Sequence, residues 1–345
     1  MKKEIRIILC GAGRVGREFL KLLDERAEMI ESKYGIRPVL SAVAESDGAA
    51  VSDGGNGLSI AGLLKHLQNG GTVPDFPIFG VSLMAGPQVI QEIKADVIIE
   101  ATPTNLSDAE PGMTNVTAAL KNGLDVISAN KGPFVLFFRE VRELAREHDC
   151  SVHLSAATAA ALPTLDVGLR SLAGSTVLSV EGILNGTTNF ILTKMEISGC
   201  RYEEALLEAQ ELGIAEKDPR YDIDGLDTAN KLILISNLIF DTDYSLGDVD
   251  VCGISRIGQE DIDGAAKRGE SIKLIGSIQT SEKGIVLRVA PEAIKRSHPL
   301  ANVSGSEKAV SYLTDTMDRI TVSGGKSSPV GAAAALLKDL INAYS

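Results

Sequence analysis

The sequence is poor in aromatic residues. They make up 4% of the 345 residues, and tryptophan is absent. Proteins that bind single-stranded nucleic acid usually stack bases on aromatic side chains. The formal net charge of −12 also repels nucleic acid and anionic membrane surfaces. We therefore expect neither nucleic acid nor a membrane as a partner.

Cysteine and histidine are equally scarce, with four residues of each type. The cysteines Cys10, Cys150, Cys200 and Cys252 form no CxxC pair, which is typical of reduced thiols in a cytoplasmic protein. None of them lies in a motif that suggests the nucleophile of an aldehyde dehydrogenase. The histidines lie in no catalytic or metal-binding pattern, so the sequence favours neither a Ser-His-Asp hydrolase nor a metal site.

Long hydrophobic runs are also missing. The N-terminal residues lack the apolar stretch and small-residue cleavage site of a signal peptide. The longest apolar stretch, Leu232–Phe240, is interrupted by Ser236 and Asn237 and is too short to span a bilayer. These features predict a cytoplasmic protein.

The sequence does contain alternating strand and helix patterns, within a hydrophobic content of 44%. Glu4–Cys10 is typical of a buried parallel strand, and a helical periodicity follows it. Further strands are expected at Pro38–Ala44, Ala95–Ala101 and Leu124–Ser128. Strands that alternate with helices predict an α/β fold with a Rossmann-type, doubly wound parallel sheet.

The pattern changes after Pro133. A helix is expected at Phe137–His148, and later segments mix strands with long helices, which predicts an α+β region. The expected strands are Val177–Ile183, Ile272–Ser277 and Gly284–Val289, and the expected helices are Tyr202–Leu212, Asp227–Leu238 and Gly331–Ala343.

A glycine-rich turn joins the first strand to the first helix. It consists of Gly11, Ala12, Gly13, Arg14, Val15 and Gly16, which matches the GxGxxG pattern in its required context. Such a turn lets a pyrophosphate approach the backbone at the helix N-terminus. A turn with no ligand is the alternative. The pattern favours a dinucleotide cofactor.

The residues at the end of the second strand indicate whether the dinucleotide is NAD or NADP. Glu45 stands there with Asp47 close by, and a carboxylate at this place would bind the ribose hydroxyls and repel a 2′-phosphate. Arg14 is a counter-argument, because it could reach a phosphate. We expect NAD to be preferred over NADP.

Four further segments narrow the prediction. They are Glu100–Asn105 (EATPTN), Ser128–Pro133 (SANKGP), Gly182–Ile191 (GILNGTTNFI) and Gly213–Leu232 (GIAEKDPRYDIDGLDTANKL). Together, and in this order, they resemble the homoserine dehydrogenase family. The resemblance implies NAD(P)-dependent interconversion of L-homoserine and L-aspartate 4-semialdehyde, in the biosynthesis of threonine, methionine and isoleucine.

The resemblance also implies the organisation of the chain. Residues 1–132 would form the nucleotide-binding domain, residues 133–310 the substrate-binding and dimerisation domain, and residues 311–345 a segment that returns to the first domain. A homodimer is implied, in the short form without an amino-acid-sensing domain.

Two lysines receive catalytic roles from the resemblance. Lys231 matches the catalytic lysine of the family, and Lys131 matches a second active-site lysine that also lies near the cofactor. Asp227 lies four residues before Lys231, so the two would share one face of a helix. An exposed ion pair with a purely structural role is the alternative.

Carboxylates are dense in the last of the four segments. The resemblance gives the substrate α-ammonium to Glu216 and Asp227, and we add Asp222, while Asp218 and Asp224 are expected to be exposed. A solvated acidic loop is one alternative. A calcium loop is another, although the spacing lacks the remaining EF-hand ligands.

The other expected site residues follow from the same resemblance. Gly213 would contact the substrate, and the turn of Asn185, Gly186 and Thr187 would offer backbone N–H groups and a hydroxyl to its carboxylate. Thr102 would lie near the nicotinamide, and Gly324, in the segment Ser323–Lys326, would touch the cofactor.

One position departs from the family. Relatives often have a glutamate that helps to bind a monovalent cation where this chain has Ser155, so we expect no requirement for sodium or potassium. Two other functions stay open: a different NAD(P)-dependent amino-acid or aldehyde oxidoreductase, and a catalytically silent NAD-binding sensor. The paired lysines argue against the sensor.

Overall fold

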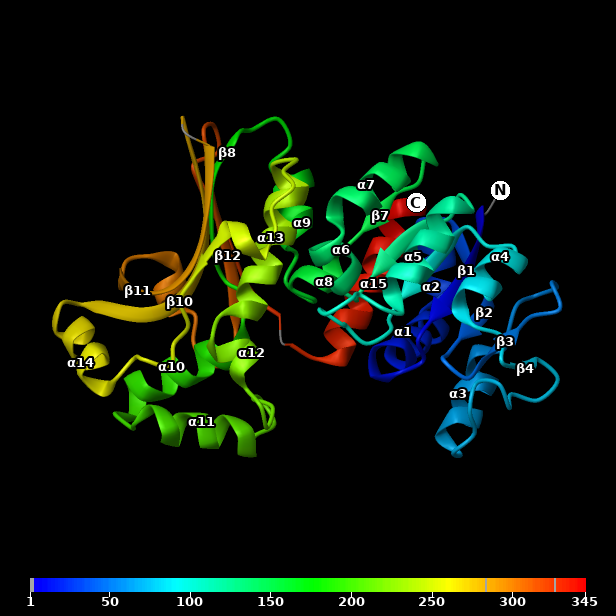
Figure 1. The fold of residues 1–345 in the computed structure, drawn as a ribbon, viewed down its shortest axis with the longest axis horizontal. Coiled ribbons are helices and arrows are strands. Elements are labelled where there is room, and N and C mark those ends of the chain that lie inside the picture. Colours follow the sequence, from blue (N-terminus) through cyan, green and yellow to red (C-terminus); the bar gives the residue numbers. More distant parts are fainter. Residues whose placement is uncertain (1–2, 283, 326) are drawn as a thin grey trace. The chain divides into compact units, whose positions relative to one another are not determined.

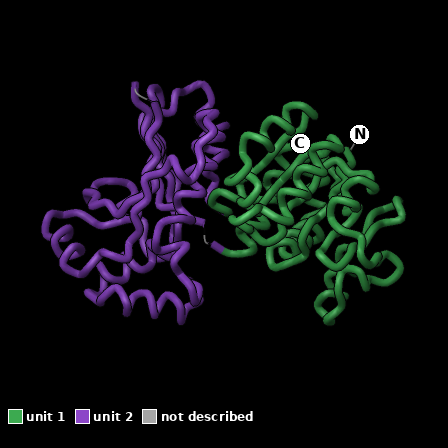
Figure 2. Tube along the Cα trace, in the orientation of Figure 1, with its two compact units in different colours: residues 1–160, 328–345 green, residues 161–327 purple. Residues whose placement is uncertain are grey.

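The computed structural model describes residues 3–282, 284–325 and 327–345. The chain divides into two compact units, Met1–Ala160 with Ser328–Ser345, and Ala161–Ser327 (Figure 2). The first unit is larger than the predicted nucleotide-binding domain, because residues 133–160 add a strand and three helices to it. The returning segment begins at Ser328 and not at residue 311, because the strands before it belong to the sheet of the second unit.

The first unit is built on a seven-stranded sheet of order β4-β3-β2-β1-β5-β6-β7. The five strands from β2 to β7 in this order are parallel, which confirms the predicted doubly wound sheet. The strands β3 and β4 at one edge are antiparallel, and neither was predicted from the sequence. The strands are β1 (Lys3–Cys10), β2 (Ile36–Ala44), β3 (Gly48–Val51), β4 (Gly80–Ser82), β5 (Val97–Glu100), β6 (Asp125–Ser128) and β7 (Val152–His153).

Helices cover both faces of this sheet (Figure 1). Ile5, Ile7 and Leu9 of β1 alternate onto one face, where they share a core with Phe19 of α1 and Leu336 of α15. The chain's last helix is therefore part of the first unit. The helices are α1 (Arg14–Glu25), α2 (Ala27–Tyr34), α3 (Ile60–Gln68), α4 (Gly86–Glu92), α5 (Gly112–Lys121), α6 (Gly132–Leu136), α7 (Phe138–Glu147), α8 (Ser155–Thr158) and α15 (Pro329–Tyr344).

The second unit contains a six-stranded, mostly antiparallel sheet of order β13-β12-β8-β10-β11-β9. Helices α10 and α13 pack on its central strand β10, which confirms the predicted α+β region. The strands are β8 (Val177–Ile183), β9 (Val249–Val251), β10 (Glu270–Ser281), β11 (Gly284–Lys295), β12 (Lys308–Thr314) and β13 (Arg319–Gly324).

The helices of the second unit differ greatly in length. They are α9 (Thr164–Asp166), α10 (Gly186–Ser198), α11 (Tyr202–Glu211), α12 (Arg220–Ile223), α13 (Leu226–Ile239) and α14 (Gln259–Lys267), with a π-helical turn at Val167–Ser171 and 3₁₀ turns at Leu246–Asp248 and Pro299–Asn302. The longest of them, α13, is buried along most of its length and carries Asp227 and Lys231.

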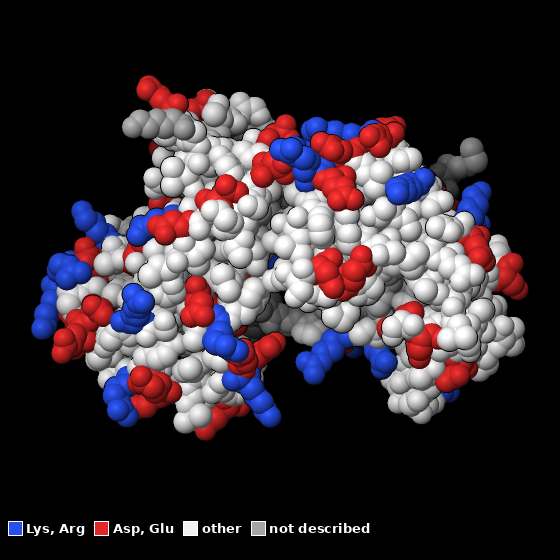
Figure 3. All heavy atoms as spheres, viewed as in Figure 1, with Lys and Arg blue, Asp and Glu red and all other residues white. Residues whose placement is uncertain are grey.

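Two surface properties bear on the expected partners. Within the described residues, no helix is both long and apolar enough to cross a membrane. On the face that Figure 3 shows, acidic and basic side chains are interspersed over each unit. No continuous basic patch, of the kind typical of nucleic-acid-binding proteins, is visible among the described residues on this face.

Candidate active site

The glycine-rich turn of the first unit has the geometry of a dinucleotide-binding loop. Gly11 has a φ of +94°, and a Cβ there would lie 2.8 Å from the backbone of Ala101. A Cβ on Gly16 would lie 2.0 Å from the carbonyl oxygen of Gly11. Helix α1 begins directly afterwards at Arg14, and its N-cap residue Gly13 has no side chain to cover the first turn. The N-terminal amides of α1 therefore suit an anionic pyrophosphate.

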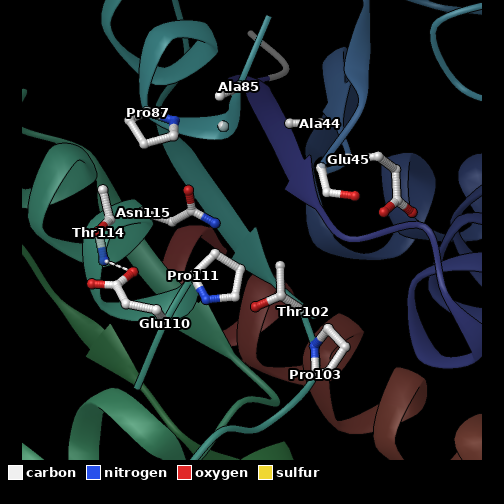
Figure 4. A pocket seen from close by; sticks show the side chains of 12 residues that line it. Ala44, Glu45, Ala85, Pro87, Thr102, Pro103, Glu110, Pro111, Thr114 and Asn115 are labelled. Atoms are coloured by element: carbon white, nitrogen blue, oxygen red, sulfur yellow. Dashed lines mark hydrogen bonds between the residues drawn. The ribbon is translucent and has the colours of Figure 1, made fainter. Parts of the chain in front are cut away.

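A cavity of about 600 Å³ lies beside this turn, at the carboxyl ends of β2 and β5 (Figure 4). Glu45 and Thr102 face it, together with Asn115 from α5. None of the described residues that line it is basic. The complete lining is Ala44, Glu45, Ser46, Ala85, Gly86, Pro87, Thr102, Pro103, Glu110, Pro111, Thr114 and Asn115.

Glu45 connects this cavity to the glycine-rich turn. Its Oε1 accepts a hydrogen bond of 2.5 Å from the backbone N–H of Ala12. Partial burial raises the pKa of Glu45, although the Ala12 amide favours the ionised form. The position at the end of β2 is the one that the sequence predicts for a ribose-binding carboxylate. The residues of this unit thus fit a dinucleotide without a 2′-phosphate.

A buried network at the end of β5 holds the residues expected near the nicotinamide. Glu100 is fully buried, and its carboxylate accepts hydrogen bonds from the backbone N–H and the hydroxyl of Thr102 and from the Asn115 amide. Asn130 donates to the Thr102 hydroxyl at 3.0 Å and accepts from the N–H of Gly132. Asn130 and Gly132 are the two neighbours of Lys131 in the sequence, so these hydrogen bonds fix the backbone of Lys131. No role was predicted from the sequence for Glu100 or Asn130, although both lie within the quoted motifs.

The second unit contains the cluster around Lys231. The Nζ of Lys231 donates to Asp227 Oδ2 at 2.5 Å and to the carbonyl oxygen of Leu184 at 2.8 Å. The side chains of Lys231 and Asp227 are only 13% and 8% exposed. The alternative of an exposed surface pair is therefore wrong for this lysine.

Asn185 and Thr187 link a second carboxylate to the cluster. The Nδ2 of Asn185 donates to Asp222 at 2.7 Å and to Asp227 at 2.9 Å, while its Oδ1 caps helix α10. The Thr187 hydroxyl donates to Asp222 at 2.8 Å. A Cβ on Gly186 would lie 2.8 Å from the carbonyl oxygen of Ser306, so glycine is required there for packing. These contacts bring together four of the predicted residues with Lys231: Asn185, Thr187, Asp222 and Asp227.

Glu216 and Gly213 lie outside this cluster. Both are exposed, and Gly213 ends helix α11 in a left-handed conformation with a φ of +68°. The Glu216 backbone is held by a hydrogen bond of 3.1 Å from Gln210. Asp218 and Asp224 are exposed, as predicted. The described contacts place the Glu216 carboxylate in solvent.

Gly324 ends strand β13 in the second unit, with a φ of +121°. It pairs with Lys308 at the beginning of β12. Lys326, in the same segment, lies outside the described residues.

Lys308 was not predicted as a site residue from the sequence. This side chain is 1% exposed. Burial, followed by the nearby positive charge of Lys231, lowers the pKa of Lys308 to about 7, while Asp227 opposes the shift. No motif marks a lone lysine at the start of a strand, so only the fold reveals this neighbour of the cluster.

Comparison with known proteins identifies the family. The homoserine dehydrogenase family model matches residues 163–341, and the model of the homoserine dehydrogenase NAD-binding domain matches residues 11–155. The chain belongs to the homoserine dehydrogenase family. This family consists of NAD(P)-dependent oxidoreductases, as the glycine-rich turn and the buried lysine cluster lead one to expect.

Individual relatives extend over the whole chain. The homoserine dehydrogenase of Methanocaldococcus jannaschii is 39% identical, with 98% of each chain covered. The NAD(+)-dependent homoserine dehydrogenase of Pseudomonas canavaninivorans is 33% identical, covering 99% of this chain and 96% of the relative. The homoserine dehydrogenase structure from Thiobacillus denitrificans superposes with a TM-score of 0.85 at 29% identity, covering 99% of this chain and 73% of that one.

Proposed function

We propose that this member of the homoserine dehydrogenase family interconverts L-homoserine and L-aspartate 4-semialdehyde, with NAD as the preferred cofactor. The observation that supports this most strongly is the largely buried Lys231 ammonium of the second unit, which Asp227 and the Leu184 carbonyl hold in place. An ammonium so placed can donate a proton to an aldehyde oxygen as that oxygen gains charge. The proposal includes a homodimer in the cytoplasm.

Each candidate residue has a distinct task in the proposed reaction. In the oxidative direction Lys231, in its neutral form, accepts the proton of the homoserine hydroxyl. Bound NAD supplies the acceptor for the hydride that leaves the same carbon. Lys131 polarises the reacting oxygen. In the reverse direction Lys231 returns the proton to the oxygen.

The carboxylates would bind the other end of the substrate. A substrate α-ammonium requires converging oxygen acceptors, and Asp222 and Asp227 already share the Asn185 amide at 2.7 and 2.9 Å. The exposed Glu216 lies on the loop before them and would complete the ammonium site. Gly213 gives that loop its turn. The amides at the start of α10, in the Asn185–Thr187 turn, suit the substrate carboxylate.

The choice of NAD rests on the first unit. Glu45 projects from the end of β2 into a cavity whose described lining residues include two carboxylates and no basic side chain. A 2′-phosphate there would meet negative charge without a counter-ion. The glycines of the turn, with Arg14 and Val15, would hold the pyrophosphate, and Thr102, Lys131 and Gly324 would lie toward the nicotinamide.

A spectrophotometric assay tests this function. Purified protein is incubated with NAD and L-homoserine, and with L-serine, L-threonine and L-malate as control substrates. We expect NADH formation with homoserine at a kcat/KM at least about tenfold above any control. NADH formation with a control and not with homoserine would favour a different dehydrogenase. Tight NAD binding with no turnover of any substrate would favour the sensor.

A further inference from the structure

The carboxylate of Glu100 is buried near the centre of the first unit's sheet. Glu100 ends strand β5, which lies between β1 and β6, and its side chain is 0% exposed. The sheet winds from β1 toward β4 in one direction and from β5 toward β7 in the other, so the direction changes between β1 and β5. In doubly wound sheets the ligand binds outside the carboxyl ends of the strands at this point.

The two residues that follow Glu100 pack against the glycine-rich turn. A Cβ on Gly11 would lie 2.8 Å from backbone atoms of both Ala101 and Thr102. Thr102 also lines the cavity of about 600 Å³, as Asn115 does (Figure 4). A dinucleotide whose pyrophosphate lies on the turn would therefore pass along Ala101 and Thr102. The Glu100 carboxylate is one hydrogen bond away from that path, because the cavity-lining hydroxyl of Thr102 donates to it.

The hydrogen bonds around Glu100 suit an ionised carboxylate. Oε1 accepts from the backbone N–H and the hydroxyl of Thr102, and Oε2 accepts from the Asn115 amide at 2.9 Å. Asn130 fixes the direction of the Thr102 hydroxyl: its Oδ1 accepts from the Gly132 N–H, so its Nδ2 is the group that donates to Thr102. The Thr102 proton is then directed at Glu100. Burial raises the pKa of Glu100, and these donors oppose that rise.

The groups that donate to Glu100 are neutral, so they stabilise its charge without cancelling it. A charge inside the protein is screened less than a charge at the surface and acts on other charges over a longer distance. The nicotinamide ring is positively charged in NAD and neutral in NADH. A buried carboxylate near the ring therefore distinguishes the two forms of the cofactor. Contacts with the adenosine half cannot do so, because that half is the same in both.

We propose that the buried Glu100 carboxylate stabilises the positively charged nicotinamide of NAD relative to the neutral ring of NADH. Thr102 separates Glu100 from the cavity, so Glu100 is a positioning residue and not a catalytic one. In the reductive direction a hydride leaves nicotinamide C4 for the aldehyde carbon, Lys231 gives its proton to the aldehyde oxygen, and the ring becomes positive. Glu100 thus favours the homoserine side of the reaction on the protein. This inference rests on the proposed function and on a nicotinamide placed near Thr102.

Two isosteric variants test the proposal. Glu100→Gln removes the charge, and its amide oxygen can still accept from Thr102, so the variant separates charge from hydrogen bonding. Glu45→Gln is the matched control, since Glu45 lines the same cavity but is expected at the adenosine ribose. The measurement is the Kd for NAD and the Kd for NADH by isothermal titration calorimetry, with folding checked by circular dichroism.

The proposal predicts a selective loss of affinity. Glu100→Gln should raise the Kd for NAD by about tenfold or more and change the Kd for NADH by less than about twofold, because only NAD carries the ring charge. Glu45→Gln should change both Kd values by similar factors. If Glu100→Gln weakens both forms equally, or neither, Glu100 has only a structural role and the proposal is wrong.

A second measurement decides the matter if Glu100→Gln does not fold. Infrared spectra of protein labelled with ¹³C at the glutamate side-chain carboxyl distinguish ionised from protonated groups. At neutral pH we expect Glu45→Gln to show ionised glutamates only. A protonated band in that variant would overturn the proposal, since a neutral Glu100 cannot stabilise a cation. Neither measurement requires turnover, so inactivity toward homoserine would refute the proposed function while these results still decide the role of Glu100.

Discussion

Asp227 and Lys231 stand four residues apart, a spacing that usually means an exposed helical ion pair worth ~0.2–0.5 kcal/mol. In the structure both side chains are largely buried, and Asn185 and the Leu184 carbonyl extend the pair. Desolvation cancels much of the stability that a buried ion pair provides. Burial of this pair therefore adds little net stability, and it is compatible with the proton transfer that we propose for Lys231.

The exposed carboxylate of Glu216 gives the first residue-scale prediction. Glu216→Gln keeps the shape but removes the charge that would face the substrate ammonium, so KM for homoserine should rise more than kcat falls. Asp218→Asn is the control, because Asp218 is also exposed and is paired with Arg220. Steady-state kinetics of both variants decide the matter. Equal KM values for homoserine in Glu216→Gln and the wild type would show that Glu216 does not bind the substrate.

Lys308 gives a prediction about stability. Its pKa is about 7 in the folded chain and about 10.4 in the unfolded chain. Between these values the unfolded chain binds more protons, so this lysine destabilises the fold at low pH and the penalty disappears as pH rises. Urea unfolding should therefore show that the wild type gains stability relative to Lys308→Met from about pH 7 to about pH 10. A difference that stays constant over this range would contradict the lowered pKa.

At the scale of elements, the end of β2 should decide cofactor choice. We expect a higher kcat/KM with NAD than with NADP, because Glu45 and the acidic lining of the cavity disfavour a 2′-phosphate. Glu45→Ser should lower the ratio of kcat/KM with NAD to kcat/KM with NADP by about tenfold, which corresponds to ~1.4 kcal/mol. The assay compares both cofactors at saturating homoserine. A wild-type preference for NADP would show that Arg14, exposed at the start of α1, dominates instead.

The contact between α8 and α15 bears on the expected independence from monovalent cations. Ser155 donates to the buried Asp339 carboxylate at 2.8 Å, and the Lys338 ammonium donates to the Ser155 hydroxyl at 2.9 Å. The Lys338 ammonium also lies 3.3 Å from Asp339 Oδ1, so a side-chain cation is already beside the carboxylate that Ser155 contacts. We expect equal activity in sodium, potassium and tetramethylammonium chloride at constant ionic strength. Several-fold activation by sodium or potassium alone would refute this.

Elements differ in how well their patterns predict them. Val177–Ile183 was predicted with its exact bounds, and the long amphipathic helices were predicted to within a few residues. The antiparallel strands β3 and β4 were missed because three or four residues are too short to show an alternation. Lys308 was missed for another reason. Its neighbours in space come from β8 and α13, which are far away in the sequence.

At the scale of the whole molecule, the two units carry different parts of the proposed chemistry. The first unit holds the glycine-rich turn, Glu45 and Lys131, and the second holds the Lys231 cluster. Local patterns predicted the strand, tight turn and helix of the first unit's candidate site, since these elements are contiguous in the sequence. The second site required the family resemblance, because its carboxylates and lysines are common surface residues until the fold buries them.

The turnover of Lys231→Ala, with NAD and L-homoserine, tests the central claim most directly. The account predicts a folded protein that binds NAD as the wild type does, with kcat lowered by about 10²–10⁴-fold, the usual contribution of a general acid–base group. Lys231→Arg should restore little, because a guanidinium stays protonated near neutral pH. A folded Lys231→Ala protein that keeps more than about a tenth of the wild-type kcat would contradict the account, since Lys231 would then be only a partner of Asp227.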